Sequence, residues 1–578
     1  MLKPLTLFFC QMLWFLVCLP GWICFQFALR QPRQAQHRVL RRLIRQNRDT
    51  EFGRRHHFAS IRSCSDFATH VPLAEYEDFV DAIAAARQGE PFALTAGSPL
   101  LLEPTSGSTG APKLIPVTAA VRREFAAAVQ PWIAWLYLAH PRLFFGRQYW
   151  AISPNTPIPA PAVPTAVPVG FADDADYLGF AGRWLSRGIL AVPGEIRQVA
   201  DPEWFARLTL LFLLKEKNLR LISVWHPSFL TLLIDALPRH LPVILTALRT
   251  GNLPGDAALP TDLHAQLGRH WQKDLRRAAE IEALDLISHP ESVGRLWPHL
   301  GVISCWEGPR SEPGLGKIRT LFPQAVIQGK GLMATEGCVT LPTGCGRLRP
   351  CAIRSHYLEF LDVETGEVHP AWDLRQGRDY SVILTTGGGL WRYRLHDQVR
   401  LSGCCHATPC LEFVCKDNAV SDLVGEKLDE RHAAEALAVA ETDTGVRPEF
   451  AMIAPIGYSE RSACGYALLL EFSAPLPDLA GTAQRWADVV ERELCRNYHY
   501  NHARRLGQLL AIRPVLLQNG LQTYRHARES GGTRSGTLKI PALARAAPGQ
   551  AAWWLSACRI EIAEPRALAD IRIMETPS

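Results

Sequence analysis

The stretch that decides the fold reads "LLEPTSGSTGAPKLIPVT" and spans residues 101–118. Its apolar ends are suited to short strands, and "TSGSTGAPK" between them combines hydroxyl side chains with glycine. Hydroxyl groups and glycine-exposed backbone N–H groups can donate hydrogen bonds to phosphate, and Lys113 adds positive charge. The segment therefore predicts a phosphate-binding loop between two strands, although Ser, Thr and Gly also gather in ordinary solvated turns.

This loop does not fit the Walker pattern. That pattern requires a second glycine five positions after the first, followed by Lys and then Ser or Thr. Here the position of the second glycine is Pro112, and Leu114 follows Lys113. The P-loop NTPase class is therefore excluded. After the second strand, Thr118 is a good N-cap for a helix over residues 119–138, so the loop does not itself open a helix.

Composition bounds the class of protein. A chain of 578 residues is too long for one compact core, so at least two domains are expected. Hydrophobic residues make up 47% and charged residues 20%, which is typical of a folded globular protein. The net charge of +6 is small and scattered, so nucleic acid is not an expected partner. Fifteen irregularly spaced cysteines do not resemble a disulfide framework and favour a reducing compartment.

Residues 5–29 carry no charge and are long enough to cross a bilayer. Only Lys3 precedes them, and six arginines follow: Arg30, Arg33, Arg38, Arg41, Arg42 and Arg45. A span here would leave the rest of the chain in the cytosol. A cleaved signal peptide fits less well, because the apolar run is long and no small-x-small site closes it. The alternative is a helix buried against the main domain or lying in a membrane interface, and Pro20 argues against a straight span.

The rest of the chain predicts an α/β fold with a large N-terminal domain and a smaller α+β C-terminal domain. Residues 35–47 form a basic amphipathic helix pattern, and residues 203–300 alternate helical periodicity with short apolar runs such as "LRLISVW" and "LPVIL". Between 379 and 415 the signals are β-type: "DYSVILTT", "LWRYRL", "QVRLSG" and "LEFVC". The expected segments are an apolar N-terminal segment, a large domain that includes a β-rich subdomain, and a small domain, at 1–30, 31–417 and 418–578.

Three further stretches complete a set of chemical groups. "QGKGLMATEGCVTLP" (328–342) places Thr335 and Glu336 after an apolar strand. "GLWRYRLHDQVRL" (389–401) places Asp397 after an Arg-Tyr-Arg strand, and "GTLKIPAL" (536–543) holds Lys539 in a glycine-flanked loop. Together with the hydroxyl loop they supply phosphate donors, carboxylates for a divalent cation and for ribose, and a mobile lysine. Asp397 could instead cap a strand end, and Lys539 could be an ordinary solvated lysine.

The order and content of these motifs resemble the adenylate-forming superfamily, which includes acyl-CoA synthetases and luciferases. The closer similarity is to the auxin-responsive Gretchen Hagen three family of acyl-acid amido synthetases. Family-like text extends over about residues 49–545 and includes "VWHPSFL", "SCWEG" and "EFVCKDN". The resemblance implies an ATP-dependent, magnesium-requiring ligase. Such an enzyme activates a carboxylic acid as an acyl-adenylate and transfers it to an amino acid or another amine.

The resemblance also implies roles for individual residues. The phosphate loop would be formed by Ser106, Gly107, Ser108, Thr109 and Lys113. Thr335 would lie close to the α-phosphate and Glu336 would bind Mg2+. Asp397 would hold the ribose, and Lys539 would move in for adenylation as the small domain turns near residues 416–418.

Three positions depart from the family pattern. His396 replaces a common glycine before Asp397, Lys416 replaces a common arginine at the domain junction, and Leu332 replaces a residue that is often aromatic. Arg and Lys are not equivalent at a bidentate site. His396 could crowd the ribose, and Leu332 would not stack on adenine as an aromatic residue would.

The cluster "CCHATPCLEFVC" (404–415) could be interpreted as zinc ligands, but its spacing fits no common pair of Cys-x-x-Cys motifs, so zinc is disfavoured. Two other functions stay open beside the amido synthetase. One is a ligase that transfers the acyl group to a thiol such as coenzyme A. The other is a non-catalytic, membrane-tethered binding protein with a degenerate site. The expected location is the cytoplasm, with membrane association through residues 5–29 as an alternative.

Overall fold

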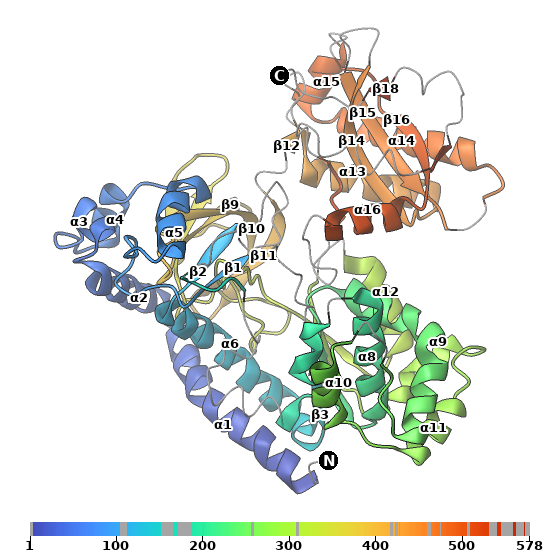
Figure 1. Ribbon diagram of the computed structural model, residues 1–578. Helices are drawn as coiled ribbons and strands as arrows, with labels where there is room; N and C mark the ends of the chain where they lie inside the picture. The colour runs from blue at the N-terminus through green and yellow to red at the C-terminus, as the bar shows by residue number, and fades with distance from the viewer. Residues whose placement is uncertain are drawn as a thin grey trace. The chain divides into compact units, whose positions relative to one another are not determined.

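A computed structural model gives the fold of this chain (Figure 1). The structure describes residues 4–104, 113–151, 166–170, 188–199, 201–255, 259–307, 311–416, 420–421, 426, 428–458, 464–473, 476–505, 509–530, 540–544, 559–561 and 571–572. Contacts divide the chain into two compact units. The larger contains Met1–Leu395 and Val399–Phe413, and the smaller contains His396–Gln398 and most of the chain from Val414 onward. The predicted α/β class, with a larger N-terminal and a smaller C-terminal part, is confirmed.

Helices form the N-terminal part of the larger unit. They are α1 (Pro4–Ala28), α2 (Pro32–Asn47), α3 (Glu51–Arg55), α4 (Cys64–His70), the 3-10 turn η1 (Tyr76–Phe79) and α5 (Val80–Arg87). The predicted amphipathic helix is confirmed as α2, which buries Val39, Leu40 and Leu43 on one face. The apolar segment is the helix α1, which runs alongside α6 (Figure 1). It is one of two helices in the described ranges that are long and apolar enough to cross a membrane.

The segment 101–118 folds as predicted on both sides of its loop. Strands β1 (Leu101–Pro104) and β2 (Leu114–Val117) pair antiparallel, with Pro104 opposite Leu114. Thr118 then accepts a hydrogen bond from the backbone N–H of Val121 at 3.2 Å and caps α6 (Ala119–Ala139). The loop therefore joins two strands of a hairpin.

A four-stranded parallel sheet forms the centre of the α/β part. Its order is β3 (Arg147–Trp150), β4 (Leu219–Ser223), β5 (Val302–Cys305) and β6 (Val326–Gly329). Because all four strands are parallel, their carboxyl ends lie at one edge of the sheet, where α/β proteins bind ligands. The accompanying helices are η2 (Pro141–Phe145), η4 (Gly194–Gln198), α8 (Pro202–Lys215), α9 (Pro227–Thr250), α10 (Thr261–Gly268), α11 (Leu275–Glu282), η5 (Pro290–Leu296) and α12 (Glu312–Leu321).

One apolar run in this part has a different structure from the one its composition suggests. "LPVIL" (241–245) lies inside the helix α9, whereas "LRLISVW" contains β4 as expected. Helical spacing places Leu237, Leu241, Ile244 and Leu248 on one buried face of α9, so tertiary packing decides the conformation. This burial also explains the apolar composition of α9, because core helices of globular proteins are equally hydrophobic.

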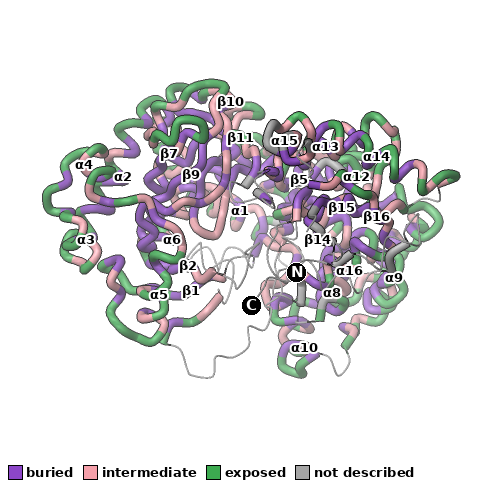
Figure 2. The backbone as a smooth tube through the Cα atoms, turned by 90° about the horizontal axis from the view of Figure 1, so that it is seen from above, coloured by how far each residue is buried: buried purple, intermediate pink, exposed green. Residues whose placement is uncertain are grey.

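A second sheet of the larger unit supplies the β-rich region. Its order is β11 (Thr408–Lys416), β10 (Tyr393–Cys405), β9 (Asp379–Thr385), β7 (Tyr357–Asp362) and β8 (Val368–Pro370). Buried positions, drawn in purple, gather around β7 and β9 in Figure 2. The predicted "LWRYRL" and "QVRLSG" strands are in fact parts of one long strand, β10. The chain passes from one to the other through His396, whose φ is 60°.

The smaller unit is α+β, as predicted. Its main sheet has the order β17 (Arg559–Glu561), β16 (Arg513–Gln518), β15 (Cys464–Glu471), β14 (Phe450–Tyr458) and β18 (Ile571–Arg572), and a short pair joins β12 (Val420–Ser421) to β13 (Leu428–Asp429). The helices are α13 (Glu430–Thr444), α14 (Leu479–Leu494), α15 (Tyr498–Arg505) and α16 (Gly520–Ser530). Ile453, Leu468 and Trp486 belong to its buried core.

Candidate active site

Lys113 lies where the hydroxyl loop enters β2. Its ammonium nitrogen Nζ lies 5.1 Å from the ring centre of Tyr76 and 5.8 Å from that of Tyr393, and donates to the Tyr393 hydroxyl at 3.4 Å. The predicted phosphate-loop residues Ser106, Gly107, Ser108 and Thr109 lie outside the described residues. The aromatic rings therefore position the one described cation of the predicted phosphate loop.

Tyr76 fixes the backbone immediately after Lys113. Its hydroxyl accepts a hydrogen bond from the Leu114 N–H at 2.7 Å and donates to the Leu114 carbonyl at 3.3 Å. Burial raises the pKa of Tyr76, and the negative charges of Glu77 and Glu336 raise it further. The phenol therefore stays protonated at neutral pH, and Glu336 is close enough to act on it electrostatically.

Thr335 and Glu336 form the tip of a tight turn after β6. The backbone N–H of Ala334 donates to the Gly337 carbonyl at 3.0 Å, and the N–H of Gly337 donates to the Ala334 carbonyl at 3.2 Å. Both tip residues are half-buried. Since Glu336 influences Tyr76, which binds the residue after Lys113, the structure brings two predicted site residues into one region across more than 200 positions of sequence.

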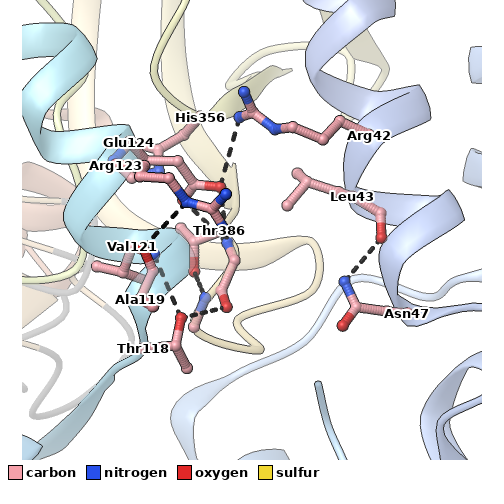
Figure 3. Close-up of polar contacts among 12 residues, drawn as sticks. Arg42, Leu43, Asn47, Thr118, Ala119, Val121, Arg123, Glu124, His356 and Thr386 are labelled. Atoms are coloured by element: carbon pink, nitrogen blue, oxygen red, sulfur yellow. Dashed lines mark hydrogen bonds and ion pairs between the residues drawn. The ribbon is translucent and has the colours of Figure 1, made fainter. Parts of the chain in front are cut away.

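A buried Glu-His pair supports this region from below (Figure 3). The Glu124 carboxylate lies 3.0 Å from Nδ1 of His356, and the side chains of both residues are almost fully buried. Glu124 also accepts two hydrogen bonds from the Gly387 N–H, at 2.9 and 3.2 Å, and lies 3.7 Å from the guanidinium of Arg42. A Cβ atom on Gly337 would approach the His356 ring to 3.0 Å, so the imidazole packs directly against the end of the Thr335–Glu336 turn.

Sequence reasoning missed Glu124 and His356. A signal for Glu124 was present, because helical spacing places it on the buried face of α6 with Val121 and Ala128. A carboxylate on a buried helix face requires partners. His356 carried no comparable signal, since its partner lies 232 residues away in sequence.

Asp397 lies inside β10, so the alternative that it caps a strand end is wrong. Its side chain is 3% exposed and takes a buried position in the alternating pattern of the strand. Contacts assign His396–Gln398 to the smaller unit, whereas Lys113 and Glu336 belong to the larger one. Asp397 therefore stays a predicted ribose ligand and is not part of the group around Lys113.

Lys539 lies outside the described residues, and so does the side chain of Lys416 at the end of β11. The segment just after Lys539 is anchored within the smaller unit. The Ile453 N–H donates to the Ala542 carbonyl at 2.8 Å, and the Ala542 N–H donates to the Glu430 carboxylate at 3.1 Å. The lysine therefore precedes a segment that is hydrogen-bonded to β14.

Leu332 packs in the hydrophobic core of the larger unit and is 9% exposed. Its backbone N–H donates to the hydroxyl of Thr340 at 2.8 Å. These contacts give the residue a structural role in the connection between β6 and the Thr335–Glu336 turn.

The cysteine-rich hairpin contains a disulfide. Cys345 and Cys405 are bridged with their Cα atoms 6.1 Å apart. This bridge differs from the expectation of a reducing compartment, because structural disulfides are rare in cytosolic proteins. Within the described ranges, no three His, Cys, Asp or Glu side chains are grouped closely enough to hold a metal ion.

Comparison with known proteins places the sequence in context. The model of the GH3 family N-terminal domain matches residues 24–327, which is more than half of the chain, and the model of the GH3 family central domain matches residues 350–416. Among curated proteins, the rice (Oryza sativa subsp. japonica) "Probable indole-3-acetic acid-amido synthetase GH3.4" is 24% identical over 467 residues. That match covers 71% of this chain and 69% of the rice protein.

Two further comparisons extend this result. The Arabidopsis thaliana indole-3-acetic acid-amido synthetase GH3.15 is 24% identical over 444 residues, covering 71% of this chain and 72% of its own length. A solved structure described as the AtGH3.15 acyl acid amido synthetase in complex with 2,4-DB superimposes with a TM-score of 0.79 at 20% identity. It covers 93% of this chain and 95% of the solved one, which establishes a shared fold.

Proposed function

We propose that this chain, which belongs to the GH3 family, is an ATP-dependent acyl-acid amido synthetase. It activates a carboxylic acid as an acyl-adenylate and transfers the acyl group to the amine of an amino acid or a related acceptor. The observation that carries the proposal is the meeting of Lys113, Tyr76 and Glu336 in the larger unit. The names of the relatives as amido synthetases support the same activity.

In the first half-reaction a carboxylate oxygen of the acid attacks the α-phosphorus of ATP. A new P–O bond forms, the bond to the β-phosphate breaks, and pyrophosphate leaves. The protein must offset negative charge that spreads over the phosphates. In the proposal, Lys113 and the donors Ser106, Gly107, Ser108 and Thr109 hold the phosphates, and Asp397 holds the ribose.

Glu336 is the proposed magnesium ligand. Its carboxylate lies at the tip of a turn, half-buried and next to the Lys113 region. One protein carboxylate fits this ion, because Mg2+ bound to nucleotides takes most of its ligands from phosphates and water. When bound, the ion neutralises phosphate charge. Thr335 at the same tip would donate its hydroxyl to the α-phosphate, and the buried Glu124–His356 pair would keep the turn in place.

In the second half-reaction the neutral amine attacks the acyl carbonyl and AMP leaves. We propose that the smaller unit turns about residues 416–418, bringing Lys539 in for adenylation and withdrawing it for transfer. This movement would let the amine approach the carbonyl from a side that Lys539 occupies during the first half-reaction.

Acid-dependent exchange of pyrophosphate into ATP tests the proposed function. Purified protein with ATP, Mg2+ and a panel of carboxylic acids should exchange labelled pyrophosphate, and hydroxylamine should trap a hydroxamate. Amino acids should then serve as acceptors and coenzyme A should not. A thioester product would instead favour the acyl-CoA-type ligase. No exchange across the panel would favour the non-catalytic binding protein.

We also propose that the protein is cytoplasmic and attaches to a membrane through α1, which lies along the surface and does not span it. One face of α1 contacts α6 and η2. On that face the fully buried Gln11 donates to the Gly146 carbonyl at 2.6 Å and accepts hydrogen bonds from Tyr137 and from Gln148. A spanning α1 would leave these buried polar groups unpaired, which is costly.

The opposite face of α1 is apolar and exposed. Its large side chains are 41–69% exposed: Leu5, Phe9, Leu13, Leu16, Val17, Ile23 and Phe27. The following helix adds positive charge, including a groove of about 430 Å³ lined by Arg41, Arg42, Arg45 and Gln46. An apolar face beside exposed arginines matches an anionic lipid surface.

Vesicle flotation tests this attachment. The wild-type protein should float with phosphatidylcholine vesicles that contain phosphatidylserine, and Phe9→Glu with Phe27→Glu should abolish flotation. Ile287→Glu, an exposed apolar residue outside α1, is the matched control and should float normally. Wild-type protein that stays with the aqueous fraction, or that covers α1 by dimerising in light scattering, would contradict the proposal.

A further inference from the structure

Lys330 is a buried lysine at the ligand-binding edge of the parallel sheet. It follows the last residue of β6, and its backbone N–H donates to the carbonyl of Cys305, the last residue of β5, at 2.9 Å. The residue is only 8% exposed. Its position at the carboxyl ends of two neighbouring strands is where α/β sheets bind ligands.

Two indole rings surround the ammonium group of Lys330. Its Nζ lies 4.3 Å from the ring centre of Trp225, just after β4, and 5.5 Å from that of Trp132 on α6. Trp132 is held in place by a hydrogen bond from its Nε1 to the side chain of Gln328 at 3.0 Å. Trp132 is buried, whereas Trp225 is 44% exposed, so the enclosure reaches the surface at Trp225.

The ammonium group has aromatic neighbours but no anion. Among the described residues, no carboxylate and no hydrogen-bond acceptor reaches its Nζ. Burial lowers the pKa of Lys330 to about 7, and the nearby Cys305 thiol only partly offsets this effect. A buried cation without a counter-ion is costly, and contact with aromatic faces compensates only part of that cost. A ligand that brings its own negative charge would complete the site.

We propose that Lys330, enclosed by Trp132 and Trp225, binds the carboxylate of the acid substrate before activation. This inference rests on the proposed function. Neutralising the acid lowers its repulsion from the phosphates of ATP, and the two indoles favour an acid with a flat apolar body. From Lys330 the chain runs directly into the turn that carries Thr335 and Glu336, so acid binding and phosphate binding use one connection.

The test uses Lys330→Met and Lys330→Arg with Lys215→Met as a matched control. Nζ of Lys215 also lies over an indole, 4.8 Å from the centre of Trp271, and it hydrogen-bonds the His270 carbonyl at 2.8 Å away from the proposed site. Acids such as indole-3-acetate and 2,4-DB are titrated in pyrophosphate exchange. Lys330→Met should raise the KM for the acid at least about tenfold at unchanged KM for ATP, Lys330→Arg should recover part of it, and Lys215→Met should resemble wild type.

A binding measurement without ATP separates this inference from the proposed function. In protein with 13C-methylated lysines, the NMR signal missing from Lys330→Met should titrate near pH 7, and its pKa should rise when acid is added. An unchanged KM for the acid in Lys330→Met, a pKa that does not respond to acid, or a raised KM for the amine alone would overturn the inference. Absence of exchange in the wild type, with the NMR shift present, would overturn the proposed function only.

Discussion

Glu124 and Lys330 are both buried ionisable residues of the larger unit, yet their surroundings differ completely. The Glu124 carboxylate contacts His356, the Gly387 N–H and Arg42. The Lys330 ammonium has only aromatic faces and the Cys305 thiol around it within the described part of the chain. A buried group whose partners are all supplied by the protein stabilises the fold. A buried group that lacks one is suited to a ligand.

Glu336 should give the largest effect and sets the reference for this comparison. Glu336→Ala should lower pyrophosphate exchange by about 10³-fold, because the proposed Mg2+ ligand is lost, while thermal unfolding stays near wild type. Asp397→Ala should behave in the same way through the ribose. Near-normal exchange in either variant, measured at saturating ATP, would show that the nucleotide binds elsewhere.

Glu124→Ala should affect the fold more than any change at Lys330. Removing the carboxylate leaves His356 and the Gly387 N–H without their buried partner, which costs about 3 kcal/mol of unfolding free energy. Urea unfolding monitored by tryptophan fluorescence measures this loss. Glu412→Ala, at an exposed position of β11, is a suitable control and should change stability little. Equal stability of the two variants would remove the distinction drawn here.

Lys330→Met should shift stability in the opposite direction. The folded-state pKa of about 7 lies below the unfolded value of about 10.4, so the folded state binds fewer protons between these values. Wild-type stability should therefore rise with pH above about 7, whereas Lys330→Met should lack this dependence. The groups that face Lys330 are Trp132, Trp225 and Cys305, and burial raises the pKa of Cys305 to about 12, outside this window.

Melting temperatures at pH 7 and pH 9 measure this effect. At pH 7 the Lys330→Met variant should melt higher than wild type, and the difference should shrink at pH 9. A variant that melts lower than wild type at both values would mean that the ammonium has a stabilising partner in the folded protein.

Tyr76→Phe should give the smallest effect. It removes the hydroxyl that binds both backbone groups of Leu114, at a cost of about 1 kcal/mol, and should raise the KM for ATP a few-fold because Lys113 loses part of its support. The control is Tyr149→Phe, because the buried Tyr149 hydroxyl has no hydrogen-bond partner among the described residues. Tyr149→Phe should be neutral or stabilising, and a larger loss there than at Tyr76 would contradict this assignment.

Local patterns in the sequence predicted the parts of the fold whose causes are local. The β1–β2 hairpin, the Thr118 cap, the helix α2 and the α+β tail were all predicted because turn chemistry, capping and periodicity act over a few residues. The same patterns failed at "LPVIL", which is part of α9, and at the two strand signals that merge into β10. Short apolar runs suit either a strand or a buried helix, and only their neighbours decide between them.

The sequence by itself determined the order of the motifs, the hydroxyl loop without a Walker lysine, the turn residues Thr335 and Glu336, and the apolar character of α1. Only the tertiary structure decided that Tyr76 joins Lys113 to Glu336, that Glu124 is paired with His356, and that Lys330 is enclosed without an anion. It also decided that Gln11 holds one side of α1 against α6. The physical reason is that burial and charge pairing are created by residues far apart in the chain, whereas turns, caps and periodicity depend on neighbours.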